Sequence, residues 1–543
     1  MPIHRPGQTV SETPSHVLTL PLEVEPWQTT DLDKTFEAAR LLYNSLVRHF
    51  LKQYELYQNS RQYKISTAIL ENKKSTDSQK FRARRVLNAL KDKLGLSRTG
   101  FESKSAKLCG GWLTGRLYSM VRQKVANDCW AAFSKLLSGK GKQVKFKSYY
   151  DKEATLRNKW IKGDFRYDNG YFICNNLTIP VKFPKNDPYV TECMTHRIKY
   201  CGLSRRVIRG KVRYYISLYL EGVAPMKMTP EGELKHPVAF GSKVGIDIGT
   251  QTVTLSSRNG VWGGVLAAEI GNVQAMQNKL RRINRAMDRS RRATNPWAFD
   301  QEGKIVSIDK VPTEHKNEYG RRKWTVSKRY ETLKAKRKEL YRKQAAVRRL
   351  SHQMLVYKVL SFGTDIHVEK MNFAALAKRA KETKKSKKTG KFLSKKRSGK
   401  SLANRAPAMF IEMLQLKVVA VGGTLHKSNT YKIKASQIDH QTKECVKKTL
   451  DQRYHHLQDG TKIQRDFYSA FIEEHVDEAN NVVDFEACNR DFPNFYKMYQ
   501  VEMNRLTAYE GYLPSSLGIK RNPHERKNLR PQECSNNQQP QIA

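Results

Sequence analysis

The chain has 543 residues, enough for three or four domains with separate hydrophobic cores. Its 100 Lys and Arg residues against 51 Asp and Glu give a formal net charge of +49, an excess typical of proteins that neutralise a phosphate backbone. The absence of a signal peptide and of an apolar run of about 18 residues argues against a membrane protein and predicts a soluble, cytoplasmic one. None of the eight cysteines forms a Cys-x-x-Cys pair, so disulfides are not expected.

The N-terminal half divides into a helical part and a β-rich part. A strand is predicted at 16–24, and helical periodicity extends over 31–137. From 141 to about 240 the pattern changes to short segments with strand character. The predicted strands are 144–147, 171–174, 177–183 and 213–220, with turns at Asn169-Gly170 and Arg209-Gly210.

The segment GIDIGTQTVTL at 245–255 has the pattern of a hairpin with one acid on its first strand. Asp247 interrupts an apolar run, Gly249 and Thr250 can turn tightly, and alternation then resumes. The pattern is typical of a hairpin in an RNase H-like sheet, although an ordinary strand that ends in an Asp-x-Gly turn has it too. A carboxylate on a buried strand is costly without a cation partner, so Asp247 is a candidate metal ligand.

Two long helices and a basic run follow. Helices are predicted at 268–292 and 321–360, and thirteen Lys or Arg lie between 321 and 349. A solvated face is the ordinary explanation of such a helix, but few acids are present to neutralise it, which favours a polyanion alongside. The run 378–400 holds twelve Lys or Arg and one Glu, and we expect it to be mobile when unbound.

Three acids stand at the ends of predicted elements. Asp247 lies on the hairpin strand, Glu369 ends a strand within 364–376, and Asp466 opens a helix within 461–475. Carboxylates that converge from different elements can hold two divalent ions for in-line phosphodiester hydrolysis. A further apolar helix is predicted at 408–423, and the tail from about 514 is expected to be disordered.

The order and context of these motifs resemble those of TnpB-type proteins, the RNA-guided nucleases of insertion sequences, and of their compact type V CRISPR effector relatives. KGKQVKFKSYY (140–150) resembles the family's segment that enters the β-domain, and GIDIGT resembles its first RuvC motif, with Asp247 in the catalytic position. RRLSHQMLVYKVLSFGTDIHVEKMN (348–372) resembles the second motif with Glu369, and QRDFYSAF (464–471) resembles the third with Asp466. The likeness runs from about 15 to 505.

The resemblance implies a bilobed α/β multidomain effector with a helical recognition lobe, a β-barrel-like wedge domain and an RNase H-like RuvC nuclease domain. Its implied partners are a guide RNA and a target double-stranded DNA with a short flanking motif, in a prokaryotic cytosol or nucleoid. Base pairing would choose the sequence, and the protein would read shape and backbone. Its implied cofactor is Mg²⁺, as two ions held by Asp247, Glu369 and Asp466, with Mn²⁺ as a substitute.

The expected layout, in chain order, is an N-terminal segment with the first wedge strand (1–30), a helical recognition domain (31–140), a wedge domain (141–240), the RuvC domain (241–435), a degenerate zinc-ribbon-like segment (436–462), the third RuvC motif with C-terminal helices (463–513) and the tail (514–543).

The sequence departs from the family in two places. Gln464 stands for the first Asp of the third motif, and Tyr468 for its usual Asn. The family's zinc ribbon has two Cys-x-x-Cys pairs, whereas 436–460 offers one Cys and three His, namely Cys445, His440, His455 and His456. We therefore expect no structural zinc there. Arg453 matches an Arg that lies near the cleavage site in relatives.

Several cations are candidates for contact with nucleic acid: Lys145, Lys147, Arg337, Lys338, Lys384, Lys385, Lys387 and Lys388. The main alternative function is a nuclease-dead, RNA-guided DNA-binding protein that acts as a repressor. An actin-like ATPase would need a second Asp-x-Gly strand and a glycine-rich adenosine loop, which the sequence lacks. A DDE-type transposase fits the order of the acids less well. Oligomeric state is left open.

Overall fold

The computed structural model describes residues 14–519 except 110–112, 114, 116, 159–162, 175, 319, 380–381, 384, 386–389, 391, 393–398, 450–451, 478, 480 and 510–512. The chain divides into two compact units, Met1–Met228 and Thr229–Ala543. No helix of the described residues has the length and apolar character that crossing a bilayer requires.

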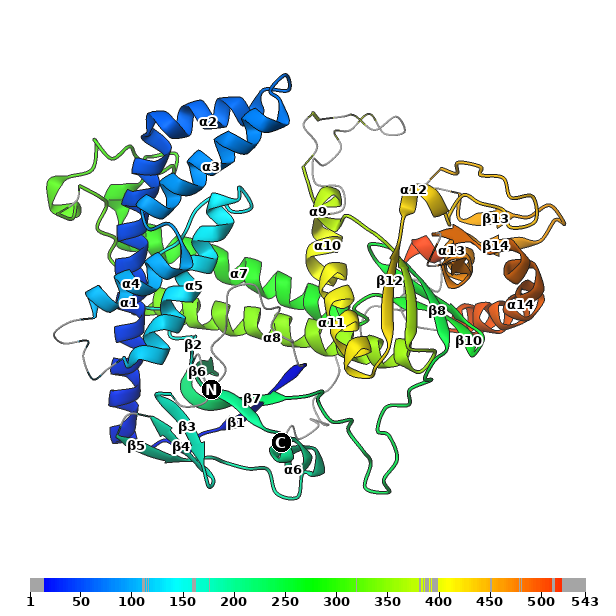
Figure 1. Ribbon diagram of the computed structural model, residues 1–543, viewed down its shortest axis with the longest axis horizontal. Coiled ribbons are helices and arrows are strands. Elements are labelled where there is room, and N and C mark those ends of the chain that lie inside the picture. The colour runs from blue at the N-terminus through cyan, green and yellow to red at the C-terminus, as the bar shows by residue number, and fades with distance from the viewer. Residues whose placement is uncertain are drawn as a thin grey trace. The chain divides into compact units, whose positions relative to one another are not determined.

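The first unit contains a group of packed helices, as the periodicity predicts (Figure 1). Helix α1 (Pro26–Asn59) begins before the expected Asp31, because Pro26 occupies its first turn and Glu25 and Gln28 form a reciprocal capping box. Leu46 and Phe50 on α1 are buried in the core that this helix shares with α4 and α5. The other helices of this group are α2 (Arg61–Glu71), α3 (Asp77–Lys93), α4 (Arg98–Leu108) and α5 (Ser119–Leu137).

Two open antiparallel sheets complete the first unit. One has the strand order β1-β7-β6-β2 and the other β3-β4-β5. Their bounds are β1 (Ser15–Pro21), β2 (Ala154–Arg157), β3 (Phe165–Asp168), β4 (Tyr171–Cys174), β5 (Leu177–Pro180), β6 (Ile198–Ile208) and β7 (Lys211–Glu221), with α6 (Pro188–Thr195) before β6. The expected β-barrel is wrong for the described residues, because β1 and β2 remain edges of their sheet and no ladder closes it.

The strand expected at 144–147 is also wrong, since this segment is irregular. The Lys147 backbone N–H donates to Asn44 Oδ1 at 2.8 Å, and the Lys147 carbonyl accepts from Asn44 Nδ2 at 2.9 Å and from Arg40 Nη1 at 3.2 Å. Side chains of α1 thus satisfy the backbone groups that a strand would pair with a neighbour.

The second unit is built on a mixed five-stranded sheet of order β10-β9-β8-β11-β12. Strands β8 (Lys243–Ile248), β9 (Thr252–Ser257) and β10 (Gly260–Val265) are antiparallel, whereas β11 (Asp365–Glu369) and β12 (Thr424–Ser428) run parallel to β8. The predicted hairpin at 245–255 is therefore present as β8 and β9, and its first strand is the central strand of the sheet.

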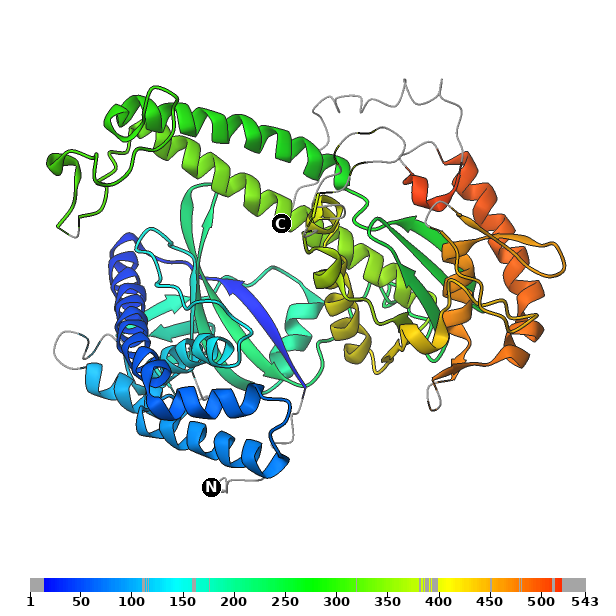
Figure 2. The same ribbon diagram turned by 90° about the horizontal axis from the view of Figure 1, so that it is seen from above.

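Alternation along the strands separates an apolar face from a polar one. Val244, Ile246 and Ile248 of β8 pack with α8 and α11 in one hydrophobic core. Helix α13 (Arg465–Glu474) crosses the opposite face, and α14 (Phe485–Ala508) packs against β10 (Figure 2). The second face of β8 bears Asp247, so α13 and this acid share one side of the sheet.

The unit contains further elements besides the sheet, α13 and α14. They are α7 (Ile270–Thr294), α8 (Lys328–Leu360), α9 (Phe373–Leu376), α10 (Gly399–Arg405), α11 (Pro407–Ala420), α12 (Thr430–Ile433), β13 (Tyr454–His456), β14 (Lys462–Gln464), β15 (Val476–Asp477) and β16 (Val482–Val483), with 3₁₀ turns at Pro296–Ala298, Thr313–His315 and Ser515–Leu517.

Helices α7 and α8 lie side by side (Figures 1 and 2). The helix expected at 321–360 begins only at Lys328, because Ser327 caps it by accepting a hydrogen bond from Tyr330 N at 3.1 Å. The residues before the cap form an irregular connection in which the Trp297 and Trp324 rings lie 5.7 Å apart. The first part of 321–360 is thus a loop.

Candidate active site

The polar face of the sheet is held against α13 by a close backbone approach at Gly245. A Cβ added to Gly245 would lie 1.9 Å from the Ala470 carbonyl oxygen and 2.3 Å from Glu474 N, both backbone atoms of α13. Thr254 Oγ1 of β9 also donates a 2.8 Å hydrogen bond to the Asp466 carbonyl, at the start of the helix. These contacts fix the helix that carries Asp466 over the strand that carries Asp247.

Asp247 sits near the end of β8, paired in register with Thr254. Burial raises the pKa of the Asp247 carboxyl well above its ordinary value, and the charges of Asp466, Glu369 and Glu473 raise it further. The positive charge of Arg465 lowers the pKa of Asp247. Asp247 therefore lies close enough to Asp466, Glu369 and Glu473 for their charges to act on its carboxyl, as neighbouring candidates for one metal site should.

Glu369 and Asp466 reach this site from different elements. Glu369 is the last residue of β11, and burial raises the pKa of its carboxyl. Asp466 lies in the first turn of α13 and is 9% exposed. Burial raises the pKa of Asp466, while the adjacent Arg465 and Arg453 lower it, and Arg465 Nε lies 3.7 Å from Asp466 Oδ1.

Glu473 is a fourth acid of this site, which the sequence reasoning missed. It lies two helical turns after Asp466 on α13, and it is only 1% exposed. Ser428 Oγ of β12 donates a 2.6 Å hydrogen bond to Glu473 Oε2, whereas Oε1 is buried with no hydrogen-bond partner among the described residues. Burial raises the pKa of Glu473 to about 7, with a contribution from Glu369. The seven-residue spacing from Asp466 was the available signal.

The carboxylates fit a site for Mg²⁺ or Mn²⁺, because these ions prefer oxygen ligands and Glu473, which is near Glu369, has a buried Oε1 with no hydrogen-bond partner among the described residues. Within the described part of the chain, no three of the four acids have ligand oxygens that all lie within 4.8 Å of one another. Binding of one ion by three of them therefore requires side-chain rotation.

The departures from the family's third motif have structural explanations. Gln464 is the N-cap of α13, and its Oε1 accepts a hydrogen bond from Phe467 N at 3.0 Å. The Tyr468 hydroxyl lies 2.9 Å from His440 N and 2.8 Å from His440 Nδ1, so it ties the segment 436–462 to α13. Both substitutions thus stabilise the helix on which Asp466 stands.

The residues of the degenerate ribbon are engaged in different ways. His440 is buried beside Tyr468, and His455 contacts Lys448 Nζ. Cys445 and His456 are exposed. That this segment binds no structural zinc stays a prediction. The Arg453 carbonyl accepts a backbone hydrogen bond from Arg465 N at 2.9 Å, which places Arg453 next to the acidic cluster.

The candidate nucleic-acid residues are dispersed. Lys145 is exposed, and Lys147 Nζ lies 4.2 Å from the centre of the Tyr43 ring. On α8, Lys338 is exposed and Arg337 Nη1 lies 3.4 Å from Asn284 Oδ1 of α7. Lys385 Nζ lies 5.3 Å from the centre of the Phe392 ring. Lys384, Lys387 and Lys388 lie outside the described residues.

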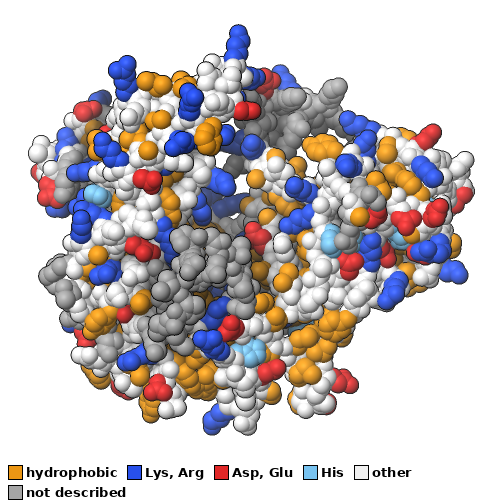
Figure 3. Space-filling model, viewed as in Figure 1, with side chains coloured by type: hydrophobic (Ala, Val, Ile, Leu, Met, Phe, Trp, Pro, Cys, Tyr) orange, Lys and Arg blue, Asp and Glu red, His pale blue; other side chains and the backbone are white. Residues whose placement is uncertain are grey.

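Basic side chains are not gathered into a single patch on the face shown in Figure 3, where they are interspersed with acidic ones. On α8, Arg342 makes 2.7 and 2.8 Å hydrogen bonds to Glu339. Helices α7 and α8 are rich in Lys and Arg by sequence, so part of the charge excess of the chain is carried by these two helices.

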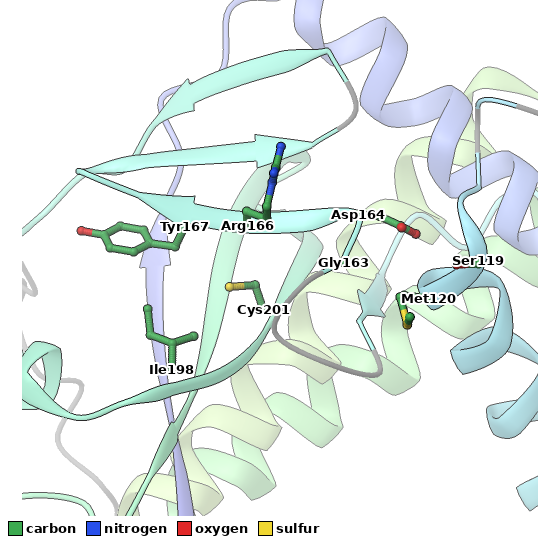
Figure 4. A pocket seen from close by; sticks show the side chains of 8 residues that line it. All are labelled: Ser119, Met120, Gly163, Asp164, Arg166, Tyr167, Ile198 and Cys201. Atoms are coloured by element: carbon green, nitrogen blue, oxygen red, sulfur yellow. The ribbon is translucent and has the colours of Figure 1, made fainter. Parts of the chain in front are cut away.

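The first unit contains a separate pocket of about 630 Å³ beside the start of α5 (Figure 4). Asp164 lines it and accepts a 3.1 Å hydrogen bond from Val121 N in the first turn of α5. Among the described residues that line it, Arg166 is the one cation and Asp164 the one acid, and the others are uncharged. This pocket contains none of the predicted site residues.

No protein-family model matches the sequence, and no curated protein matches it. The structure is similar to that of a Cas12f1–sgRNA–target DNA complex, with a TM-score of 0.37 and 9% identity over 84% of this chain and 98% of that one. It is also similar to a CRISPR-Cas12f ternary complex, with a TM-score of 0.23 and 12% identity over 82% of this chain and 81% of the other. At these TM-scores the likeness establishes neither a shared fold nor an activity.

Proposed function

We propose that this protein is an RNA-guided DNA endonuclease that hydrolyses phosphodiester bonds at the acidic cluster on the polar face of the second unit's sheet. The observation that carries the proposal is that Glu369 and Asp466 lie beside Asp247 on the polar face of the sheet, near the ends of β8 and β11 and under the start of α13. The three acids come from a central strand, a neighbouring strand and a helix that are far apart in sequence. The resemblance of the same three motifs to TnpB-type proteins supplies the guided part of the proposal.

The order and direction of the strands support an RNase H-like interpretation of this sheet. The first acid lies on the central strand of an antiparallel hairpin, and the second ends the adjacent parallel strand. The resemblance assigns Asp247 to the first RuvC motif and Glu369 to the second, and the strands that carry them support this assignment. They also put both acids at the same edge of the sheet, because β8 and β11 run in the same direction.

The acids and the arginines of the cluster have different proposed roles. Asp247, Glu369 and Asp466 would hold Mg²⁺, and Glu473 adds a further carboxylate beside them. Bound Mg²⁺ would stabilise developing charge on the phosphate and lower the pKa of the attacking water. Arg465 and Arg453 lie next to Asp466, where they favour its ionised form and can bind a phosphate oxygen.

The net charge supports a long polyanion as the partner. A formal charge of +49 in 543 residues is far beyond what solubility requires. Lys and Arg that neutralise phosphates release counterions from nucleic acid, and this release favours binding. We include a guide RNA and a double-stranded target DNA in the proposal on this ground and on the resemblance.

A nuclease-dead DNA-binding protein is the second candidate. The replacement of the third motif's usual Asp and Asn by Gln464 and Tyr468 favours it, since both residues have structural roles here. All three metal-ligand candidates are present, however, which favours cleavage.

The test is cleavage by purified protein that retains the RNA with which it copurifies. That RNA should be one defined species with a variable end, and DNA matching this end should be cut in Mg²⁺. Asp247→Asn should abolish cutting and leave guided binding intact, since it removes a metal ligand and few phosphate contacts. The matched control is Asp309→Asn, which changes an exposed acid in a loop of the same unit and should cut normally. Undiminished cleavage by Asp247→Asn would overturn the site, and guided binding without cleavage by the wild type would favour the second candidate.

A further inference from the structure

A second group of ligating side chains lies on the polar face of the same sheet, at the other end of β11. Asp365 and His367 are two positions apart on β11, so they project from the same face. His426 of β12 is the direct register partner of His367. The parallel pairing of two strands thus brings three side chains together that are up to 61 residues apart in the sequence.

The two imidazoles are directed at one carboxylate. His367 Nε2 lies 3.5 Å from Asp365 Oδ2, and His426 Nε2 lies 3.3 Å from Asp365 Oδ1. The two rings are stacked, with centroids 5.0 Å apart and an angle of 28° between their planes. One ligand atom from each of the three residues lies within 4.8 Å of the others, which is true of no other set of three in the described chain.

These separations match those around a small metal ion. Ligands bonded to Zn²⁺ at about 2.0–2.1 Å in a tetrahedron stand roughly 3.3–3.4 Å apart. Each His–Asp distance lies at or near that value, although each is measured to a different oxygen of Asp365. Small side-chain rotations within the 4.8 Å that encloses the three ligand atoms would bring all of them onto one ion. Thr424 Oγ1 donates a 2.8 Å hydrogen bond to Asp365 Oδ1, which fixes the carboxylate as hydrogen bonds to metal ligands commonly do.

We propose that Asp365, His367 and His426 bind one first-row transition-metal ion of the Zn²⁺ type. Two imidazoles and one carboxylate suit such an ion, whereas Mg²⁺ prefers oxygen ligands alone. His367 is 1% exposed, while His426 and Asp365 have side chains 32% and 30% exposed, so an ion can enter from the solvent side and keep a water ligand.

This site goes beyond the proposed nuclease and does not depend on it. It differs from the acidic cluster in its donor atoms, and Asp365 is separated from Glu369 by the length of β11, about 13 Å. Among the described strands, β12 is an edge strand of the sheet and pairs only with β11. An ion bound by residues of both strands would therefore stabilise the pairing of β12 with the sheet.

The test is a titration with Co²⁺ of full-length, metal-stripped protein that carries no histidine tag, in excess Mg²⁺ to occupy oxygen-only sites. We expect one equivalent to bind, with the visible absorption of a four- or five-coordinate ion, and Zn²⁺ to displace it. His426→Ala and Asp365→Asn should each weaken binding more than roughly tenfold, since changing even an outer hydrogen-bond partner can cost that much. These two residues are partly exposed, so the variants should fold, which the circular dichroism of the metal-free proteins checks.

Two controls separate this site from others. Asp247→Asn should keep the Co²⁺ spectrum while it loses DNA cleavage, so failure of this site and failure of the proposed nuclease are distinguishable. His456→Ala, at an exposed histidine of the same unit, should bind Co²⁺ as the wild type does. Absence of stoichiometric binding, or binding that survives His426→Ala, would overturn the proposal. Loss of binding in Asp247→Asn or Cys445→Ser would assign the ion to the acidic cluster or to segment 436–460 and would overturn it too.

Discussion

The buried carboxyl of Glu473 shows what burial of the acidic cluster costs in free energy and what can offset that cost. Ser428 donates one hydrogen bond to it, and burial raises its pKa from 4.5 to about 7. Removing a carboxylate from water costs free energy unless a cation or several donors compensate. A divalent ion beside it would favour the ionised form, as a nearby positive charge does for any carboxylate.

The raised pKa of Glu473 predicts how the free energy of unfolding depends on pH in metal-free protein. Below pH 4.5 Glu473 is protonated in both the folded and the unfolded chain, so its ionisation does not change the free energy of unfolding. As pH rises from there to about 7, the unfolded chain releases the proton first, and the free energy of unfolding falls by an amount on the order of 2–3 kcal/mol. Glu473→Gln should remove this part of the decrease, as measured by urea denaturation with a chelator at about pH 5 and pH 8.

The other acids of the cluster contribute in the same direction, so the variant should retain some loss of stability at high pH. Glu331→Gln, at an exposed acid of α8, is the control and should keep the wild-type difference. An identical pH dependence in Glu473→Gln and wild type would show that Glu473 is not buried as described.

At the scale of elements, the site depends on how closely α13 approaches β8. Gly245→Ala would place a methyl group 1.9 Å from the Ala470 carbonyl oxygen, so the helix or the strand must move. Overpacking of this kind typically costs about 1–3 kcal/mol. Because α13 carries Asp466 and Glu473, we expect a lower melting temperature together with a large loss of DNA cleavage.

Gly141→Ala is the matched control, since the nearest atoms to its added Cβ lie 3.4 Å away, an ordinary contact. Gly141→Ala should leave both the melting temperature and DNA cleavage close to those of the wild type. A Gly245→Ala protein with normal melting and normal cleavage would contradict the close packing of α13.

The basic surface of α8 is a second property of an element. Replacing Lys336, Arg337 and Lys338 together by Gln keeps helix propensity and removes three charges. If these side chains bind phosphates, binding should weaken for all sequences, and the slope of log affinity against log salt should flatten by about 0.7–0.9 for each phosphate that is no longer neutralised.

Filter binding over a range of salt concentrations measures this slope. Lys304→Gln is the control, because Lys304 Nζ already lies 2.5 Å from Glu302 Oε2 and its removal should leave the slope unchanged. An unchanged slope in the triple variant would show that this stretch of α8 is only a solvated face.

At the scale of the whole molecule, the hydrophobic cores follow the division into two units. One core is drawn from residues 18–220, and the other two from residues 244–517. We therefore expect two calorimetric transitions in nucleic-acid-free protein, since multidomain chains need not unfold as one cooperative body. Phe101→Ala and Phe410→Ala, each at a fully buried ring, should each lower one transition and spare the other.

Each substitution should cost about 3–5 kcal/mol within its own unit. Differential scanning calorimetry resolves the outcome, and a single transition that both variants lower would contradict independent units.

The sequence by itself determined the local elements that carry the three predicted acids. Local periodicity and turn chemistry predict a strand, a tight turn and a second strand around Asp247. They also predict a strand that ends at Glu369 and a helix that begins near Asp466. All of these elements are present. Local signals failed where distant side chains intervened. Residues 144–147 have strand character, but Asn44 of α1 takes their backbone hydrogen bonds.

Only the tertiary structure decided which side chains meet. Glu473 joins the acids because α13 crosses the sheet at an angle that brings it to Ser428 of the edge strand. Asp365, His367 and His426 form one group because β11 and β12 pair in parallel in one particular register. Strand order and register are set by burial of the opposite, apolar face against α8 and α11, and this depends on contacts between residues far apart in the chain, which no local pattern of the sequence contains.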